Sequence, residues 1–327
     1  YAKIRTVKRK NKRCTIMLVT VTLNPALDHI LILPEVHLGT FNRAEDTIRM
    51  PGGKGINVAC SLAVMGDEVV ATGFLGGQGC PTFETALRKL GVTTNFTYVD
   101  SEIRTDFFII EEGKNRQSLV VEEGVAIKLR YLNSFKANFE RLLSSASLVE
   151  IGGSLPNGVA PNFLKELVDM ANQKKVKVVL NLPEDMLVEC MQGTTTYMAA
   201  PDLRESKKMF GKEIYDEKAR IEIAEELQKR GAQIVILKYG NLNYYVTTKE
   251  EAWDGEIDLE KTSVMIGVRD AMLAGFIHNY QATGKLGEAL KYSLGAGRSA
   301  ANNKFNYPLS KEEIEEFLLR AKVRKVK

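Results

Sequence analysis

Residues 262–276, Thr-Ser-Val-Met-Ile-Gly-Val-Arg-Asp-Ala-Met-Leu-Ala-Gly-Phe, join a small-residue turn at Gly267 to the start of a helix. Met272 and Phe276 fall on one helical face, which predicts that this helix packs against a core. Asp270 then lies near the helix N-terminus, where unpaired N–H groups and a partial positive charge can hold a phosphate. A carboxylate at the same place can accept a proton from an attacking hydroxyl, so the stretch has the parts of a phosphoryl-transfer site. The alternative is that Asp270 only caps the helix, as Asp often does.

A second turn, residues 51–59 (Pro-Gly-Gly-Lys-Gly-Ile-Asn-Val-Ala), is rich in glycine and leads into a predicted helix at 57–65. Its three glycines permit backbone conformations closed to other residues and let a ligand approach closely. With Lys54 as a point charge, such a turn suits an anionic or polyhydroxyl ligand. It matches neither GxxxxGK[ST] nor GxGxxG, and the alternative is an ordinary strand-to-helix turn.

Strands alternate with helices along most of the chain, which predicts an α/β fold with three αβα layers around a doubly wound, mainly parallel sheet. The first strand, 17–23, is followed by Asp28, at the end of the strand where open α/β sheets bind ligands. The alternative for Asp28 is a role in a turn. Short alternating segments within 94–122 interrupt the rhythm and look like antiparallel strands. With residues from about 29–50 they are expected to form a small separate sheet within one domain at 17–327.

The composition is that of an ordinary globular protein, with 327 residues of which 44% are hydrophobic and 26% charged. No apolar run approaches the roughly 18 residues of a membrane span, so we expect no membrane-spanning helix. The four cysteines are widely scattered, and we expect reduced thiols in a cytoplasmic protein. The three histidines show no HxxxH or HExxH spacing, which argues against a zinc site.

The net charge of +4 comes from the first residues of the chain. Seven lysines and arginines precede residue 14 with no acid among them, and without them the remainder carries a charge of −3. A basic leader could bind nucleic acid or an anionic membrane, or be part of a targeting peptide. We favour a disordered or cloning-derived extension at 1–16 with Met17 as the natural start. Because the charge is confined to this leader, nucleic-acid binding is not expected.

Four pieces of the sequence occur in the order and spacing of one family. They are 24–28 (NPALD), 51–59 (PGGKGINVA), 153–158 (GSLPNG) and 267–276 (GVRDAMLAGF). Over about 17–320 the chain resembles the pfkB, or ribokinase-like, carbohydrate kinases. NPALD and the lysine of GGKG most resemble the hexose-phosphate branch, which includes 1-phosphofructokinases and tagatose-6-phosphate kinases.

The resemblance implies an αβα core, a small β-sheet lid and a sugar bound between them. It assigns four residues to the sugar hydroxyls, namely Asp28, Gly53, Lys54 and Asn57. It assigns three to the phosphate already on the sugar, namely Arg43, Arg104 and Ser154. Arginine suits this role because its planar fork matches phosphate oxygens. Asp270 matches the family's catalytic base.

The sequence differs from the family pattern where the nucleotide would bind, at 238–243 and 267–269. We call these two segments the nucleotide half. The resemblance assigns nucleotide and anion-hole contacts to Lys238, Gly240, Gly267, Val268 and Arg269. It assigns the organisation of magnesium, through water, to Asp202 and Glu205.

Several family residues are replaced around this half. The family's Gly-Ala-Gly-Asp is Gly-Val-Arg-Asp, its Ser-Leu-Gly-x-x-Gly is Lys-Tyr-Gly-Asn-Leu-Asn, its Lys-Pro-Asn is Ala-Pro-Asp, and its Asp after the central strand is Asn181. Arg269 would strain its turn if that position needs a positive φ. The alternative is that Arg269 adds a cation beside the transferring phosphate.

These observations predict an ATP-dependent kinase of a phosphorylated ketohexose that uses ATP and Mg²⁺, with Asp270 as general base. Strain at Arg269 is expected to make it slow. The alternative is a catalytically weak regulatory protein that binds a sugar phosphate. By analogy with the family, we expect a homodimer formed through the lid.

Overall fold

The computed structural model describes residues 17–201, 203, 211, 214–240, 242–259, 264–308 and 310–327. Its centre is a sheet with ten strands among these residues, in the order β14-β13-β12-β11-β10-β9-β8-β1-β4-β5. The strands from β5 to β11 are parallel, whereas β12, β13 and β14 are antiparallel. Their bounds are β1 Met17–Thr22, β4 Val69–Gly76, β5 Thr93–Val99, β8 Ala146–Gly152, β9 Lys177–Asn181, β10 Thr196–Ala199, β11 Ala232–Tyr239, β12 Asn243–Thr247, β13 Ala252–Glu256 and β14 Lys322–Lys325.

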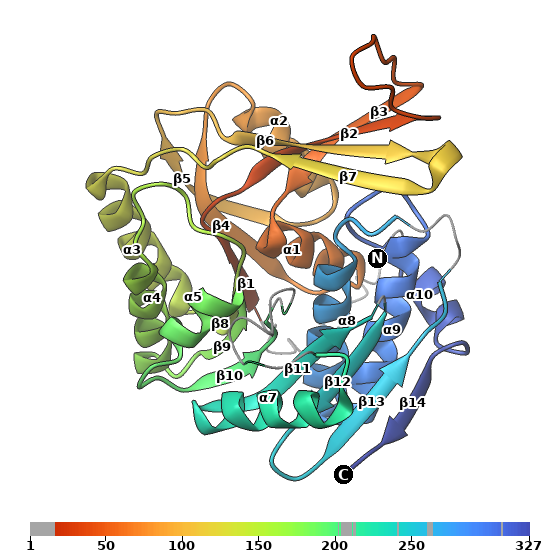
Figure 1. The fold of residues 1–327 in the computed structure, drawn as a ribbon. Coiled ribbons are helices and arrows are strands. Elements are labelled where there is room, and N and C mark those ends of the chain that lie inside the picture. Colours follow the sequence, from red (N-terminus) through yellow and green to blue (C-terminus); the bar gives the residue numbers. More distant parts are fainter. Residues whose placement is uncertain are drawn as a thin grey trace, which may run out of the picture.

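Helices cover both faces of this sheet, which confirms the predicted three-layer α/β architecture (Figure 1). One face packs against α1 Lys54–Val64, α2 Cys80–Lys89, α8 Val268–Thr283, α9 Leu286–Ala301 and α10 Lys311–Phe317. The other packs against α3 Leu129–Leu143, α4 Pro161–Gln173, α5 Glu184–Cys190 and α7 Glu217–Lys229. Every residue of the inner strand β4 is buried, as expected for a parallel strand covered on both sides.

A second, small sheet lies at one end of the large one, in the order β3-β2-β6-β7 (Figure 1). We call this sheet the lid; its strands are β2 Ala26–Leu33, β3 Asp46–Gly52, β6 Arg104–Glu111 and β7 Arg116–Val121. Two details of the prediction are wrong. The segment at 94–99 is β5 and pairs in parallel with β4 in the large sheet, because the intervening helix α2 makes a crossover connection between them. Strand β6 pairs in parallel with β2.

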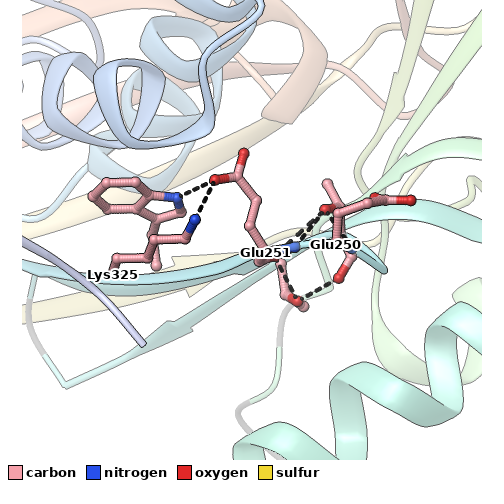
Figure 2. Close-up of polar contacts among 6 residues, drawn as sticks. Glu250, Glu251 and Lys325 are labelled. Carbon is pink, nitrogen blue, oxygen red and sulfur yellow. Dashed lines mark hydrogen bonds and ion pairs between the residues drawn. The ribbon is translucent and has the colours of Figure 1, made fainter. Parts of the chain in front are cut away.

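The C-terminal part of the chain extends the large sheet beyond what the sequence indicated. Helix α10 ends at Phe317, and β14 then pairs with β13. Figure 2 shows the turn before β13, where the Glu251 carboxylate accepts a bond from the Trp253 indole at 2.8 Å and pairs with Lys325. The short charged strand β14 was not predicted because such contacts, rather than an apolar sequence pattern, hold it at the edge of the sheet.

One face of the large sheet changes from apolar to polar toward the carboxyl ends of its strands. Alternate residues of a strand share a face, so Leu18 and Thr20 of β1 point the same way, as do Leu148 and Glu150 of β8. Leu18 and Leu148 belong to the core beneath α1 and α8, while Thr20 pairs with Glu150 one step further along. The polar end of this face therefore lies beneath the starts of α1 and α8. No helix in the described part of the chain is long and apolar enough to cross a membrane.

Candidate active site

Helix α8 begins at a turn that only glycine can make. Gly267 has φ +66°, and a Cβ there would lie 2.1 Å from the Asn306 carbonyl oxygen. Asp270 is the third residue of the helix, and its carboxylate does not cap it. Instead, its two oxygens accept bonds from the amide nitrogens of Asn57, at 2.8 Å, and Asn181, at 3.1 Å. The capping alternative is therefore wrong, and Asp270 is held by residues from α1 and β9.

The environment of Asp270 favours a proton-accepting role. The side chain is 6% exposed, and burial raises its pKa. The Lys54 ammonium, the two amides and the Arg269 guanidinium act in the opposite direction on this pKa. A carboxylate held by such opposing influences is a candidate general base.

The glycine-rich turn brings Lys54 to the same place. Gly53 has φ +114° and precedes α1, which begins at Lys54, three residues before the predicted start. A Cβ at Gly53 would meet a Thr22 methyl at 2.7 Å, so this position also requires glycine. The Lys54 Nζ atom lies 3.5 Å from the Asn181 Oδ1 atom. Asn181 thus contacts both Lys54 and Asp270.

Asp28 lies inside the lid strand β2, 3% exposed, whereas it was predicted to follow the first strand as a loop residue. Its Oδ2 atom accepts a bond of 3.5 Å from the Asn306 amide, which also donates to Asn57 Oδ1 at 2.7 Å and to the Pro51 carbonyl at 2.9 Å. Burial and then the neighbouring Asp106 carboxylate raise the pKa of Asp28 to about 8, against Arg104 and Asn306, which lower it. A continuous chain of hydrogen bonds therefore runs from Asp28 through Asn306 and Asn57 to Asp270.

Two of the three predicted phosphate ligands meet at Asn24. The Asn24 amide donates to Ser154 Oγ at 3.1 Å, and Arg104 Nη2 donates to the Asn24 carbonyl at 3.2 Å. Arg104 also pairs with Asp106 at 3.2 Å. Arg43, the third, is exposed in the connection between β2 and β3, and no contact joins it to this group among the described residues. The family resemblance assigned Arg43 to the phosphate without showing where this connection lies in space.

We call the residues that surround Asp28 and Asn24 the sugar half. Six of them were predicted, and two, Asn24 and Asn306, were not. The full set is Asn24, Asp28, Gly53, Lys54, Asn57, Arg104, Ser154 and Asn306. Asn24 was visible inside a quoted motif. Asn306 had no signal, because it lies far along the chain in an irregular segment after α9.

In the nucleotide half, the strain predicted at Arg269 is not observed. Arg269 lies in the first turn of α8 with helical geometry, and the non-glycine residues with positive φ in the described chain are Asn115 and Lys175. The strain expected at Arg269 is therefore absent, because the positive φ falls on Gly267. The Tyr244 hydroxyl donates to the Arg269 carbonyl at 3.2 Å, which joins β12 to the start of α8.

The other predicted nucleotide contacts lie at the edge of this region. Lys238 is half-buried near the end of β11. Gly240 is the first residue after this strand and is exposed, with φ +58°. Val268 is buried in α8. Asp202 and Glu205 lie outside the described residues.

The start of α8 fits a nucleotide phosphate. It is the N-terminus of a 16-residue helix, where the first N–H groups have no intrahelical acceptor, and the positive charge of Arg269 lies in the same turn. The described residues contain no group of three or more His, Cys, Asp or Glu side chains that could hold a metal.

The chain is similar to several known proteins. The family described as pfkB family carbohydrate kinase matches residues 21–304. A solved structure of a possible 1-phosphofructokinase from Thermotoga maritima is 30% identical, with a TM-score of 0.88, and the match covers 95% of this chain and 100% of that one.

Two more distant structures share the fold. Phosphofructokinase-2 from Escherichia coli, in complex with substrates and products, is 21% identical with a TM-score of 0.87, over 93% of this chain and 99% of that one. Ribokinase from Giardia lamblia is 15% identical with a TM-score of 0.75, over the same shares.

Proposed function

Since the chain belongs to the pfkB family of carbohydrate kinases, we propose that it transfers the γ-phosphoryl group of ATP to a hydroxyl of a ketohexose phosphate. The reaction is of the 1-phosphofructokinase or tagatose-6-phosphate kinase type. The observation that carries this proposal is the position of Asp270, fixed by Asn57 and Asn181 at the start of α8. It stands where a sugar between the lid and the large sheet meets a phosphate at the helix N-terminus.

Asp270 acts as general base. As the sugar oxygen attacks the γ-phosphorus, its O–H bond breaks and the proton passes to a carboxylate oxygen of Asp270. The new O–P bond forms as the bond to the bridging oxygen of ADP breaks, and the α8 N–H groups and Arg269 stabilise the negative charge. Magnesium, when bound with the nucleotide, supplies charge neutralisation at the phosphates, and Asp202 and Glu205 would orient its waters.

The sugar half recognises the acceptor. Asp28 and Lys54 bind the hydroxyls, and Arg104 and Ser154 bind the phosphate that the sugar already carries. Arg104 is held in place before substrate arrives, by the Asn24 carbonyl and Asp106. This preorganisation lowers the cost of ordering the side chain when the phosphate binds.

The regulatory alternative is not favoured. It was motivated by the family residues replaced in the nucleotide half, and one of these, Arg269, has ordinary helical geometry. Its positive charge lowers the pKa of Asp270, which supports a position close to the reacting groups. We therefore infer that Arg269 contributes charge to the transfer and that the enzyme is not slow on account of this turn.

The lid supports the expected homodimer. Leu119, Val120 and Val121 on β7 are each about half exposed, at 52%, 55% and 56%. Such an apolar strand at a sheet edge suits a second copy of the same strand. Light scattering on the purified protein measures its oligomeric state. We expect a dimer for the parent and a shift toward monomer for Val120→Lys. A monomeric parent would contradict the expected homodimer.

The test of function is a kinase assay with ATP and magnesium over a panel of acceptors. It compares fructose 1-phosphate, fructose 6-phosphate and tagatose 6-phosphate with unphosphorylated fructose and tagatose. We expect ADP release with at least one phosphorylated sugar to exceed that with its unphosphorylated parent by about a hundredfold or more in kcat/KM. Equal rates for the two classes would contradict the assigned acceptor.

A further inference from the structure

A second carboxyl group lies beneath the proposed active site, and the mechanism above does not use it. Glu150 is in the middle of β8, opposite Thr20 of β1, and is 0% exposed. Neither of its carboxyl oxygens has a hydrogen-bond partner among the described residues, and the same holds for the hydroxyl of Thr20. A buried carboxyl group without donors is costly in its charged form.

Two glycines make the room that this carboxyl group occupies. A Cβ on Gly152 would lie 2.3 Å from Glu150 Oε1, and a Cβ on Gly55 would lie 3.0 Å from Glu150 Oε2. Gly55 is in the first turn of α1, directly after Lys54, and the Gly152 position is also 3.2 Å from the Lys54 Cβ. Glu150 therefore lies directly below the turn that carries Lys54.

Glu150 is electrostatically coupled to Asp270. Burial and then the negative charge of Asp270 raise the pKa of Glu150 to about 8, while Asn181 and Lys54 lower it. The charged groups facing this region are Lys54 from α1 and Asp270 and Arg269 from α8; β1 and β9 contribute the neutral Thr20 and Asn181. Two like charges at such a site do not ionise independently.

The hydrogen bonds indicate which of the two carboxyl groups is charged. Asp270 accepts one amide bond on each oxygen, from Asn57 and Asn181, and such bonds favour the ionised form. Glu150 accepts no hydrogen bond of normal geometry among the described residues, although the Asn181 side chain is close enough to lower its pKa, and its complete burial favours the neutral form. The proton therefore belongs on Glu150 and the negative charge on Asp270.

We propose that Glu150 is a positioning residue that remains a neutral carboxylic acid at neutral pH and thereby keeps Asp270 as the single ionised carboxylate beneath the transferring phosphate. This role rests on the proposed kinase function. When Glu150 loses its proton, a second buried negative charge lies beside Asp270. That charge repels the phosphates of both substrates and competes for Lys54, so phosphoryl transfer declines.

The first test is the pH dependence of kcat/KM for the phosphorylated acceptor. In the parent we expect a fall of up to roughly tenfold between pH 7 and pH 9, as a single ionisation near 8 requires. Glu150→Gln imitates the neutral acid, so it should keep most of the activity at pH 7 and decline less steeply than the parent, with Asp28 causing the decline that remains. Thr20→Val removes the hydroxyl opposite Glu150 without changing charge, and it should retain the decline of the parent. Identical alkaline declines in the parent and Glu150→Gln would overturn the proposal.

A second test needs no turnover and so separates this proposal from the kinase function. Infrared difference spectra between pH 7 and pH 9 report the loss of a protonated carboxylic acid. Asp28 would titrate in the same range, so the measurement is made in Asp28→Asn, where Glu150 itself is unchanged. A carboxylic acid band that is lost toward pH 9 in Asp28→Asn and is missing from the double variant Asp28→Asn/Glu150→Gln supports the proposal even in a protein without activity. Absence of that band at pH 7 contradicts it, whatever the kinase assay shows.

Discussion

The two halves of the site are held in different ways. In the sugar half, Asp28, Asn57 and Asn306 are at most 7% exposed and are joined to one another by hydrogen bonds. In the nucleotide half, the described residues Lys238 and Gly240 lie at the end of β11, Lys238 half-buried and Gly240 exposed, and the proposed phosphate contacts are at the start of α8. The sugar half is thus a preorganised network of side chains, whereas the nucleotide half consists of a helix N-terminus and a positive charge.

This difference has a functional consequence. A network of side chains selects a particular pattern of hydroxyls, because each buried group must find its partner in the substrate. A helix N-terminus binds any suitably placed phosphate and depends less on side-chain identity. Apart from Asn181, whose side chain contacts both Asp270 and Lys54, the family residues replaced in this chain lie in the half that depends least on side chains.

The largest effect is expected at Asp270, where the two halves meet. Asp270→Asn keeps the size of the side chain but cannot take the proton, so kcat should fall by about 10²–10⁴-fold. Binding of the sugar phosphate, measured by calorimetry, should change little. Asp258→Asn, at an exposed ion pair with Arg320, is the matched control and should retain activity. A kcat within a few-fold of the parent would remove Asp270 from the base role.

The next effect tests the sugar half alone. Arg104→Ala should raise KM for the phosphorylated ketohexose, with a loss of roughly 2–5 kcal/mol, because a largely buried charged contact disappears and Asp106 loses its partner. Any residual rate with the unphosphorylated sugar should stay the same. Arg116→Ala removes an exposed lid arginine and serves as control. Equal losses on both sugars would mean that Arg104 does not bind the phosphate.

A smaller effect is expected in the nucleotide half. Arg269→Gln removes charge without disturbing the helix, so kcat should fall roughly tenfold, equivalent to about 1.4 kcal/mol, with KM for ATP raised as well. Arg324→Gln, on the exposed edge strand β14, should leave both constants unchanged. A rise in kcat for Arg269→Gln, measured at matched magnesium, would restore the idea that this arginine impairs the site.

The smallest effect concerns the stability of the ligand-free protein. Asp28 has a pKa of about 8 in the folded state against an ordinary 3.8, so its ionisation destabilises the folded form. The contribution of Asp28 to stability is complete below pH 4 and is lost as pH rises through 8. Asp28→Asn should flatten this decline in unfolding temperature by about 10 °C or more, while Asp46→Asn, on an exposed part of β3, should not. An unchanged slope in Asp28→Asn would show that Asp28 is ionised throughout.

Much of this arrangement was predictable from local sequence. The turn at Gly267 and the glycines before α1 are short-range features, because their backbone angles exclude other residues. Their spacing alone predicts that Asp270, Lys54 and Asn57 lie at or near the starts of helices.

What could not be predicted depends on contacts between distant segments. Asn306 and Glu150 join the site only because the chain folds back and because β8 lies between β1 and β9. Arg269 was misjudged because a family comparison shows which residue is absent and not which residue carries the positive φ. The edge strand β5 was assigned to the lid because its alternating pattern does not reveal its partner strand.

The contrast between the halves is tested most directly by calorimetry on the parent protein, with each ligand titrated alone. We expect the accepted ketohexose phosphate to bind in the absence of nucleotide, at least about tenfold more tightly than magnesium–ATP binds in the absence of sugar, a difference of about 1.4 kcal/mol or more. Such a result follows if the sugar half is prepared in advance and the nucleotide half is not. ATP binding alone with equal or higher affinity, together with a sugar phosphate that binds only after ATP, would contradict it.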